Sequence, residues 1–245
     1  MILREVAAKD NGKLAALARR IVDCRLCPRL VRHREAAAAD PPQRHRGQEY
    51  WARPLPGFGD PRARVLVVGL APAAHGGNRT GRMFTGDRSG DWLFRALHEA
   101  GFANQPTSTH AGDGLALTGA YITAALRCAP PANKPLPAEM LRCQPYLREE
   151  LALLRDARVV VALGKIGWDA YLRARRAAAL PLPRPLPRFG HAARAAMPDG
   201  TVLLGSFHPS QQNTFTGRLT RPMLQRVFVT AKRLAGAAVA ARGGP

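Results

Sequence analysis

The stretch from residue 64 to residue 90 constrains the fold of this chain more than any other. Residues 65–68 read VLVV, an apolar run that is too short for a helix of its own and that ends at Gly69. Such a run is typical of a strand buried on both faces of a parallel sheet. The loop that follows is polar and rich in glycine. Because open α/β sheets bind ligands at the carboxyl ends of their strands, the sequence predicts a ligand site in this loop.

Three further apolar runs predict three more strands, at residues 121–126, 159–163 and 201–207. Helical patterns separate the strands, so we expect all four to be parallel and the loops at their carboxyl ends to meet at one edge of the sheet. One of these loops presents Asn133 and another presents His208.

The first loop also excludes one class of ligand site. It has no GxGxxG pattern, and no lysine follows its glycines as a phosphate-cradling loop requires. Phe84 lies inside it. These features argue against a doubly wound protein with a nucleotide cofactor and favour a pocket for a flat ring.

Length and hydropathy predict a single soluble domain over residues 1–245, because a 46% hydrophobic chain of this size can bury one large core. We expect a helical segment at 1–46 and a frayed tail at 235–245. No apolar run is long enough to cross a membrane, and the first residues lack the plan of a signal peptide. The expected location is the cytoplasm.

The charge of the chain favours nucleic acid as its partner. Its formal net charge is +20, from 37 basic and 17 acidic residues. Of the basic residues 32 are arginine. A coding bias toward arginine would raise the charge without a functional cause, so a merely basic enzyme stays an alternative.

Four cysteines predict a metal centre: Cys24, Cys27, Cys128 and Cys143. The first two form a CxxC pair at the end of a predicted helix. In an intracellular protein a disulfide is disfavoured, and four thiolates match either zinc or an iron-sulfur cluster. One CxxC pair with two scattered cysteines favours a 4Fe-4S cluster, while four unrelated buried thiols stay a further alternative.

The loops carry motifs of a known family. GLAPA and GNRTGRMFTGD follow the first strand, RCAPPANKP follows the second, and HPSQQNTFTGRLT follows the fourth. Together with the four cysteines, these motifs closely resemble the family-5 (type B) uracil-DNA glycosylases. The resemblance extends from Cys24 to about Leu234.

The resemblance implies a three-layer α/β/α sandwich with a central four-stranded parallel sheet. It implies a structural 4Fe-4S cluster on the four cysteines. The implied activity is that of a monofunctional DNA glycosylase, which hydrolyses the N-glycosidic bond of uracil, hypoxanthine or xanthine in DNA and so begins base excision repair. A monomer associated with the nucleoid is expected.

The resemblance also implies roles for single residues. His208 would bind a carbonyl oxygen of the base and Phe84 would stack on its ring, so that the base is held between the two side chains. Asp87 and Asn133 would be the polar groups nearest the reacting sugar. The remaining expected contacts are to the base from Gly69, Leu70 and Ala71, and to DNA from Ser210, Asn213 and Arg218.

One position departs from related glycosylases of the type A group, which carry an acidic residue where this chain has Leu70. The substitution predicts a roomier pocket and a broader base range. It leaves Asp87 as the candidate carboxylate, with helix capping near Ser89 as its alternative role. Two other functions stay open: a metal-stapled nucleic-acid binding module without catalysis, and a type A glycosylase of narrower specificity.

Overall fold

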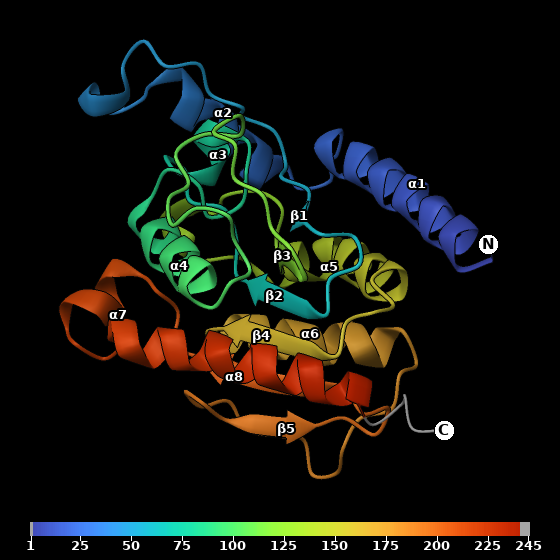
Figure 1. The fold of residues 1–245 in the computed structure, drawn as a ribbon. Coiled ribbons are helices and arrows are strands. Elements are labelled where there is room, and N and C mark those ends of the chain that lie inside the picture. The colour runs from blue at the N-terminus through green and yellow to red at the C-terminus, as the bar shows by residue number, and fades with distance from the viewer. Residues whose placement is uncertain (1, 241–245) are drawn as a thin grey trace.

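A six-stranded sheet forms the centre of the molecule in the computed structural model, which describes residues 2–240 and the side chains of residues 12–237 (Figure 1). The strand order is β1-β3-β2-β4-β6-β5. The four inner strands are parallel to one another, and β1 and β5 pair antiparallel at the two edges. The strands are β1 (Phe58–Gly59), β2 (Val65–Gly69), β3 (Ala120–Ala124), β4 (Val159–Leu163), β5 (Arg194–Ala196) and β6 (Val202–Ser206).

Helices cover both faces of the sheet because successive residues of a buried strand point to opposite sides. Val65 and Val67 pack in one core with residues of α4 and α8, and Leu66 and Val68 pack in the other with residues of α5 and α6. The α-helices are α1 (Ile2–Val22), α2 (Pro28–Ala39), α3 (Gly77–Thr80), α4 (Arg88–Glu99), α5 (Pro137–Leu153), α6 (Lys165–Ala177), α7 (Gln211–Phe215) and α8 (Arg221–Ala240). Two 3₁₀ turns, η1 (Gln43–His45) and η2 (Pro131–Asn133), complete the elements.

The expected three-layer α/β/α architecture and its four parallel strands are confirmed. The expected strand number is wrong, because β1 and β5 extend the sheet from four strands to six. These edge strands have two and three residues and are partly or largely exposed. Neither carries the apolar run by which the inner strands were predicted.

The register of the inner strands brings their loops together. Gly69 pairs with Ala124 at the ends of β2 and β3, and Leu163 pairs with Ser206 at the ends of β4 and β6. All four strands therefore deliver the chain to the same edge of the sheet, as the sequence predicts.

The end of the chain differs from expectation. Helix α8 continues to Ala240, so residues 235–240 are helical rather than frayed. Residues 241–245 of the expected tail lie outside the described residues. Among the described helices, none combines the length and the apolar character that a membrane span requires.

Candidate functional site

Phe84 occupies an unusual backbone position in the loop after β2. Its φ is +54°, and its side chain is only 6% exposed. Two glycines make room for it. A β-carbon on Gly69 would lie 2.6 Å from the Phe84 ring, and one on Gly90 would collide with the Phe84 carbonyl group. The loop therefore holds the ring firmly against the end of β2.

His208 lies beside this ring. The centroids of Phe84 and His208 are 5.9 Å apart, with 31° between the ring planes. Stacking on both faces of a base needs about 7 Å, two layers of roughly 3.5 Å. The structure brings the two residues together as expected, and their rings lie closer than the thickness of a base stacked on both faces.

The imidazole of His208 is neutral near pH 7, because burial lowers its pKa to about 4. A neutral imidazole has one N–H donor and one acceptor nitrogen. No side chain among the described residues hydrogen-bonds to the ring, so its donor is available to a ligand. The main chain of His208 is fixed by Asn213, whose Nδ2 donates to the His208 carbonyl oxygen at 2.8 Å.

Asp87 is the N-cap residue of α4, and the main-chain N–H of Gly90 donates to its Oδ1 at 2.9 Å. The capping role that the sequence left open is therefore present. The other oxygen, Oδ2, lies against Gly76. Burial raises the pKa of Asp87 above its usual value, although the capping hydrogen bonds oppose the shift.

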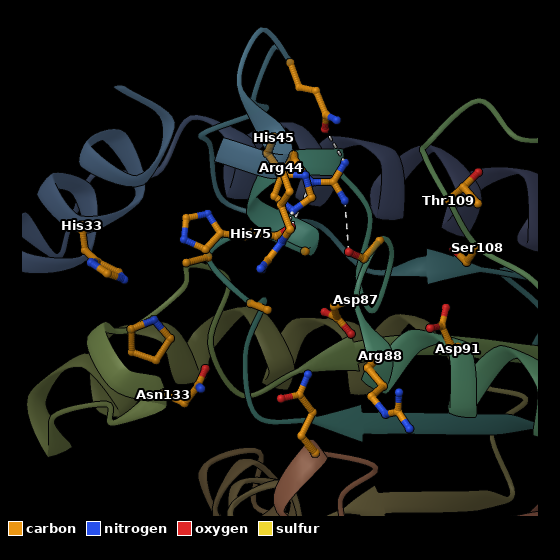
Figure 2. Close-up of a pocket in the computed structure, with 18 of the residues that line it drawn as sticks. His33, Arg44, His45, His75, Asp87, Arg88, Asp91, Ser108, Thr109 and Asn133 are labelled. Atoms are coloured by element: carbon orange, nitrogen blue, oxygen red, sulfur yellow. Dashed lines mark hydrogen bonds between the residues drawn. The ribbon is translucent and has the colours of Figure 1, made fainter. Parts of the chain in front are cut away.

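A cleft of about 890 Å³ opens beside Asp87 and extends to Asn133 (Figure 2). Asn133 lies in η2 with a φ of +56° and is exposed. The cleft thus joins the two polar residues expected near the sugar. Phe84 and His208 are not among its lining residues. Its wall also contains His33, Arg44, His45, Gln48, His75, Arg79, Arg88, Asp91, Ser108, Thr109 and Gln211.

Sequence reasoning missed the basic side of this cleft. Three of the seven histidines of the chain lie there: His33, His45 and His75. They are scattered over more than forty residues and follow no motif. The one signal in the sequence is that three of its seven histidines occur before the end of the loop that follows the first predicted strand.

The other predicted base-contacting residues are at the end of β2. Gly69 and Leu70 accept main-chain hydrogen bonds from Ala125 and Leu126, at 3.0 Å and 2.9 Å. Ala71 packs against the cluster that contains Cys128 and Cys143. This short segment therefore connects the ligand loop to the cysteines.

The predicted DNA contacts have structural roles in the loop after β6. The carbonyl oxygen of Ser210 accepts from the main-chain N–H of Asn213 at 3.0 Å. Arg218 stacks over the ring of Phe207, with its guanidinium carbon 4.5 Å from the centroid. The loop is thus ordered by its own contacts.

All four cysteines line one small pocket, although they come from two distant parts of the sequence. Cys24 and Cys27 are half-buried, and Cys128 and Cys143 are buried. Burial raises the pKa of Cys128 to about 11 and that of Cys143 to about 12. Within residues 12–237, the side chains of His, Cys, Asp and Glu form no group of three or more in metal-binding geometry.

The surroundings of the cysteine pocket fit an anionic group. Arg34 is 2% exposed and its Nη1 donates to Cys128 Sγ at 3.1 Å. The Nε atoms of Arg34 and Arg127 are buried without a partner among the described residues. Arg127 forms a buried ion pair with Glu150, whereas Arg34 has no carboxylate partner among the described residues. A buried cation such as Arg34 is stabilised by negative charge, which four metal-bound thiolates would supply.

Arg34 also connects the cysteine pocket to the ligand loop. Its carbonyl oxygen accepts from Asn78 Nδ2 at 3.1 Å, and the same amide group donates to the carbonyl of Ala74 at 3.3 Å. Asn78 belongs to α3, which begins directly after Gly76. Contacts therefore connect Cys128, through Arg34 and Asn78, to Gly76, which lies against the carboxyl group of Asp87.

Comparison with known proteins gives a consistent result. A family model described as the uracil DNA glycosylase superfamily matches residues 56–231. The chain is 52% identical over 230 residues to a Type-5 uracil-DNA glycosylase of Mycobacterium tuberculosis, covering 94% of this chain and 84% of that protein. It is 52% identical over 221 residues to the Type-5 enzyme of Thermus thermophilus, covering 90% and 98%. A Type-4 uracil-DNA glycosylase of Pyrobaculum aerophilum is 33% identical over 125 residues, covering 51% and 56%.

Proposed function

The chain belongs to the uracil DNA glycosylase superfamily, and from that premise we propose that it hydrolyses the N-glycosidic bond of uracil in DNA. The observation that carries the proposal is the pairing of Phe84 with a neutral His208 at the ends of β2 and β6. Asp87 follows Phe84 by three residues and reaches the adjoining cleft. A stacking ring, a half-buried hydrogen-bond donor and a carboxylate are the groups that this hydrolysis requires.

His208 stabilises the departing base. The base leaves with negative charge on its oxygens while the sugar becomes cationic, so a donor aimed at a base oxygen acts where charge develops. The neutral imidazole keeps one N–H, and this N–H donates the hydrogen bond to the base oxygen. The burial that keeps His208 neutral also strengthens its hydrogen bond by excluding water.

Phe84 provides the surface on which the base stacks. A base in a duplex must first be turned out of the helix at a cost of a few kcal/mol, and an aromatic face recovers part of that cost. Because His208 is too close for a base to fit between the rings, the base lies on Phe84 and meets His208 at its edge.

Asp87 acts on the sugar side of the base. One of its oxygens is used by the helix cap, which leaves Oδ2 to orient the attacking water or to stabilise the sugar cation. Asn133, whose side chain is exposed at the other end of the cleft, holds the water or an adjacent sugar phosphate.

The base range extends beyond uracil in this proposal. Leu70, rather than an acidic residue, follows Gly69, and a leucine cannot select uracil by hydrogen bonds. We expect excision of hypoxanthine and xanthine as well. A panel of duplexes that each carry one modified base tests this, and cleavage after alkali at uracil alone would refute the broader range.

Cys24, Cys27, Cys128 and Cys143 would hold a structural 4Fe-4S cluster. Support comes from their common pocket and from the buried arginines beside it. When bound, such a cluster would cross-link α2, α5 and the end of β3. Its role would be structural, because hydrolysis of the glycosidic bond needs no electron transfer. Iron and labile sulfide in the purified protein support the cluster, whereas stoichiometric zinc would contradict it. A cytoplasmic monomer associated with the nucleoid completes the proposal.

The experiment that tests the function uses an oligonucleotide with a single uracil. Incubation with the protein followed by alkali is expected to cut the strand at that position. Binding without cutting would favour the alternative of a nucleic-acid binding module.

A further inference from the structure

His191 forms a hydrogen bond to the main chain immediately before His208. The main-chain N–H of Phe207 donates to His191 Nδ1 at 3.2 Å. No main-chain oxygen of the described residues accepts this N–H. A main-chain nitrogen only donates, so Nδ1 is the acceptor of the imidazole and the hydrogen of the neutral ring is on Nε2. Burial lowers the pKa of His191, with a smaller contribution from Arg226, and so favours the neutral ring near pH 7.

The side chain of His191 continues the pairing beside β6 where the main-chain pairing ends. At Gly205 the main-chain N–H donates to the Ala193 carbonyl oxygen, and the carbonyl oxygen accepts from the Ala192 N–H, both at 2.8 Å. Ala192 has a φ of +59°, outside the extended conformation of a strand. His191 therefore reaches the N–H of Phe207 with its side chain instead of its main chain.

The segment that carries His191 is held closely against β6. A β-carbon on Gly205 would collide with the carbonyl oxygen of Gly190 and would lie 3.4 Å from the ring of Phe189. The imidazole of His191 also lies against the ring of Phe207, with 5.1 Å between the centroids and 31° between the ring planes. His191 is therefore fixed by its main chain and by a ring contact as well as by its hydrogen bond.

The main chain of His208 is thereby held on both sides. His191 holds the N–H of the residue before it. On the other side, Asn213 Nδ2 donates to the His208 carbonyl oxygen at 2.8 Å. Because the rotamers open to a side chain depend on its main-chain dihedral angles, these two contacts restrict the direction of the His208 imidazole.

We propose that His191 is a positioning residue for excision, which holds the main chain before His208 so that the His208 imidazole meets the departing base. His191 does not line the cleft beside Asp87, so its effect passes through the main chain of Phe207. A displacement of about 1 Å at a reacting group can slow a reaction about a hundredfold. A smaller effect is expected here, because Asn213 keeps its own hydrogen bond to His208. The role in excision rests on the proposed function.

Three substitutions separate the hydrogen bond of His191 from its ring contact. His191→Phe keeps a ring against Phe207 but removes the acceptor nitrogen, and a cavity of about 480 Å³ beside His191 leaves space for the larger ring. His191→Asn removes the ring but places an acceptor, Oδ1, where Nδ1 was. His191→Ala lacks both contacts and adds no atoms, so it decides the question if the phenylalanine disturbs folding. A urea titration shows that each variant is folded under the assay conditions.

The first measurement is single-turnover excision of uracil at saturating enzyme, together with the affinity for an abasic-site duplex. We expect the rate to fall about tenfold in His191→Phe and His191→Ala while the affinity changes little. We expect His191→Asn to recover most of the rate, although it lacks the ring. Equal rates in His191→Phe and the parent overturn the proposal, and so does a His191→Asn protein as slow as His191→Ala.

His110→Phe is the matched control. His110 Nδ1 also accepts a main-chain N–H at 3.2 Å, from Gly112, but His110 is exposed. The same substitution there is expected to leave the excision rate at the parent value. An equal loss of rate in His110→Phe and His191→Phe would contradict a specific role of His191.

A second measurement, made without DNA, keeps this outcome separate from that of the proposed function. By NMR, the amide hydrogen of Phe207 is expected to exchange on the order of tenfold faster in His191→Phe than in the parent, and near the parent rate in His191→Asn. Unchanged exchange in His191→Phe overturns the proposal whatever the excision rate. If the parent removes no base, the proposed function fails, and the amide exchange still decides whether His191 holds the main chain before His208.

Discussion

Gly76 lies directly against the carboxyl group of Asp87. A β-carbon on Gly76 would be 2.9 Å from both Cβ and Cγ of Asp87, closer than real β-carbon contacts. Gly76→Ala therefore displaces the Asp87 side chain and is expected to slow uracil excision by about tenfold to a hundredfold.

Gly236→Ala provides the control for that substitution. A β-carbon there would meet nothing within 4 Å, and Gly236 lies inside α8, where alanine is favoured over glycine. Its excision rate is expected to equal that of the parent. A Gly76→Ala protein with the same rate as Gly236→Ala would show that the position of Asp87 is unimportant.

Asp87→Asn separates capping from chemistry, because asparagine is also a favoured N-cap residue. Burial raises the pKa of Asp87, so above that pKa its ionised form destabilises the folded state relative to the unfolded one. Asparagine removes this charge. The variant is expected to be at least as stable as the parent at pH 7 while excising uracil about a hundredfold or more slowly.

The measurements are a urea titration and a single-turnover excision assay on the same preparation. Asp87→Ala, which loses the cap as well, is expected to lose about 1 kcal/mol of unfolding free energy. Full activity in Asp87→Asn would mean that Asp87 serves only as a cap.

The pH dependence of the reaction follows from His208. Its pKa in the folded chain is about 4, below the ordinary value of 6.5, so the neutral form persists well below neutral pH. The unfolded chain binds the proton first as pH falls, so the stability contributed by neutral His208 is present above pH 6.5 and is lost as pH falls toward 4.

The single-turnover rate at saturating enzyme is therefore expected to show no step attributable to His208 near pH 6.5. The same measurement on Asp87→Asn shows whether Asp87 contributes to the pH dependence of the rate, because this variant has no carboxyl group to titrate at residue 87. A loss of rate centred near pH 6.5 in both proteins would contradict a His208 that stays neutral at that pH.

The inner strands could be predicted because each is an apolar run of about five residues, as in Val65–Gly69. Edge strand β5, Arg194–Ala196, could not, since it has three residues and an exposed pattern and is defined by its pairing with β6. The convergence of the four predicted loops followed from the parallel topology alone.

The site was predicted less completely than the fold. Phe84 and His208 were expected together, and the structure brings them together, but their 5.9 Å separation depends on packing that no motif encodes. The basic side of the cleft was missed because His45 and His75 are thirty residues apart and become neighbours only in the folded chain, with ring centroids 6.4 Å apart.

Arg34 is expected to stabilise the cysteine pocket. Arg34→Met removes the donor to Cys128 Sγ and the 3.4 Å hydrogen bond to the Cys24 carbonyl while keeping an apolar side chain of similar length. We expect the unfolding free energy to fall by about 2 to 4 kcal/mol and the iron content per chain to decrease.

Arg25→Met is the control, because Arg25 forms an exposed ion pair with Glu35 in the same segment. Exposed pairs of this kind contribute about 0 to 1 kcal/mol. Equal stability and equal iron content in the two variants would mean that Arg34 does not support the cysteines.

The most direct test of the account is the single-turnover excision of uracil by His208→Ala, measured at saturating enzyme together with the affinity for an abasic-site duplex. We predict a rate at least about a hundredfold below the parent, with affinity changed little, because His208 acts on the departing base rather than on the backbone. An excision rate equal to that of the parent would contradict the proposed site.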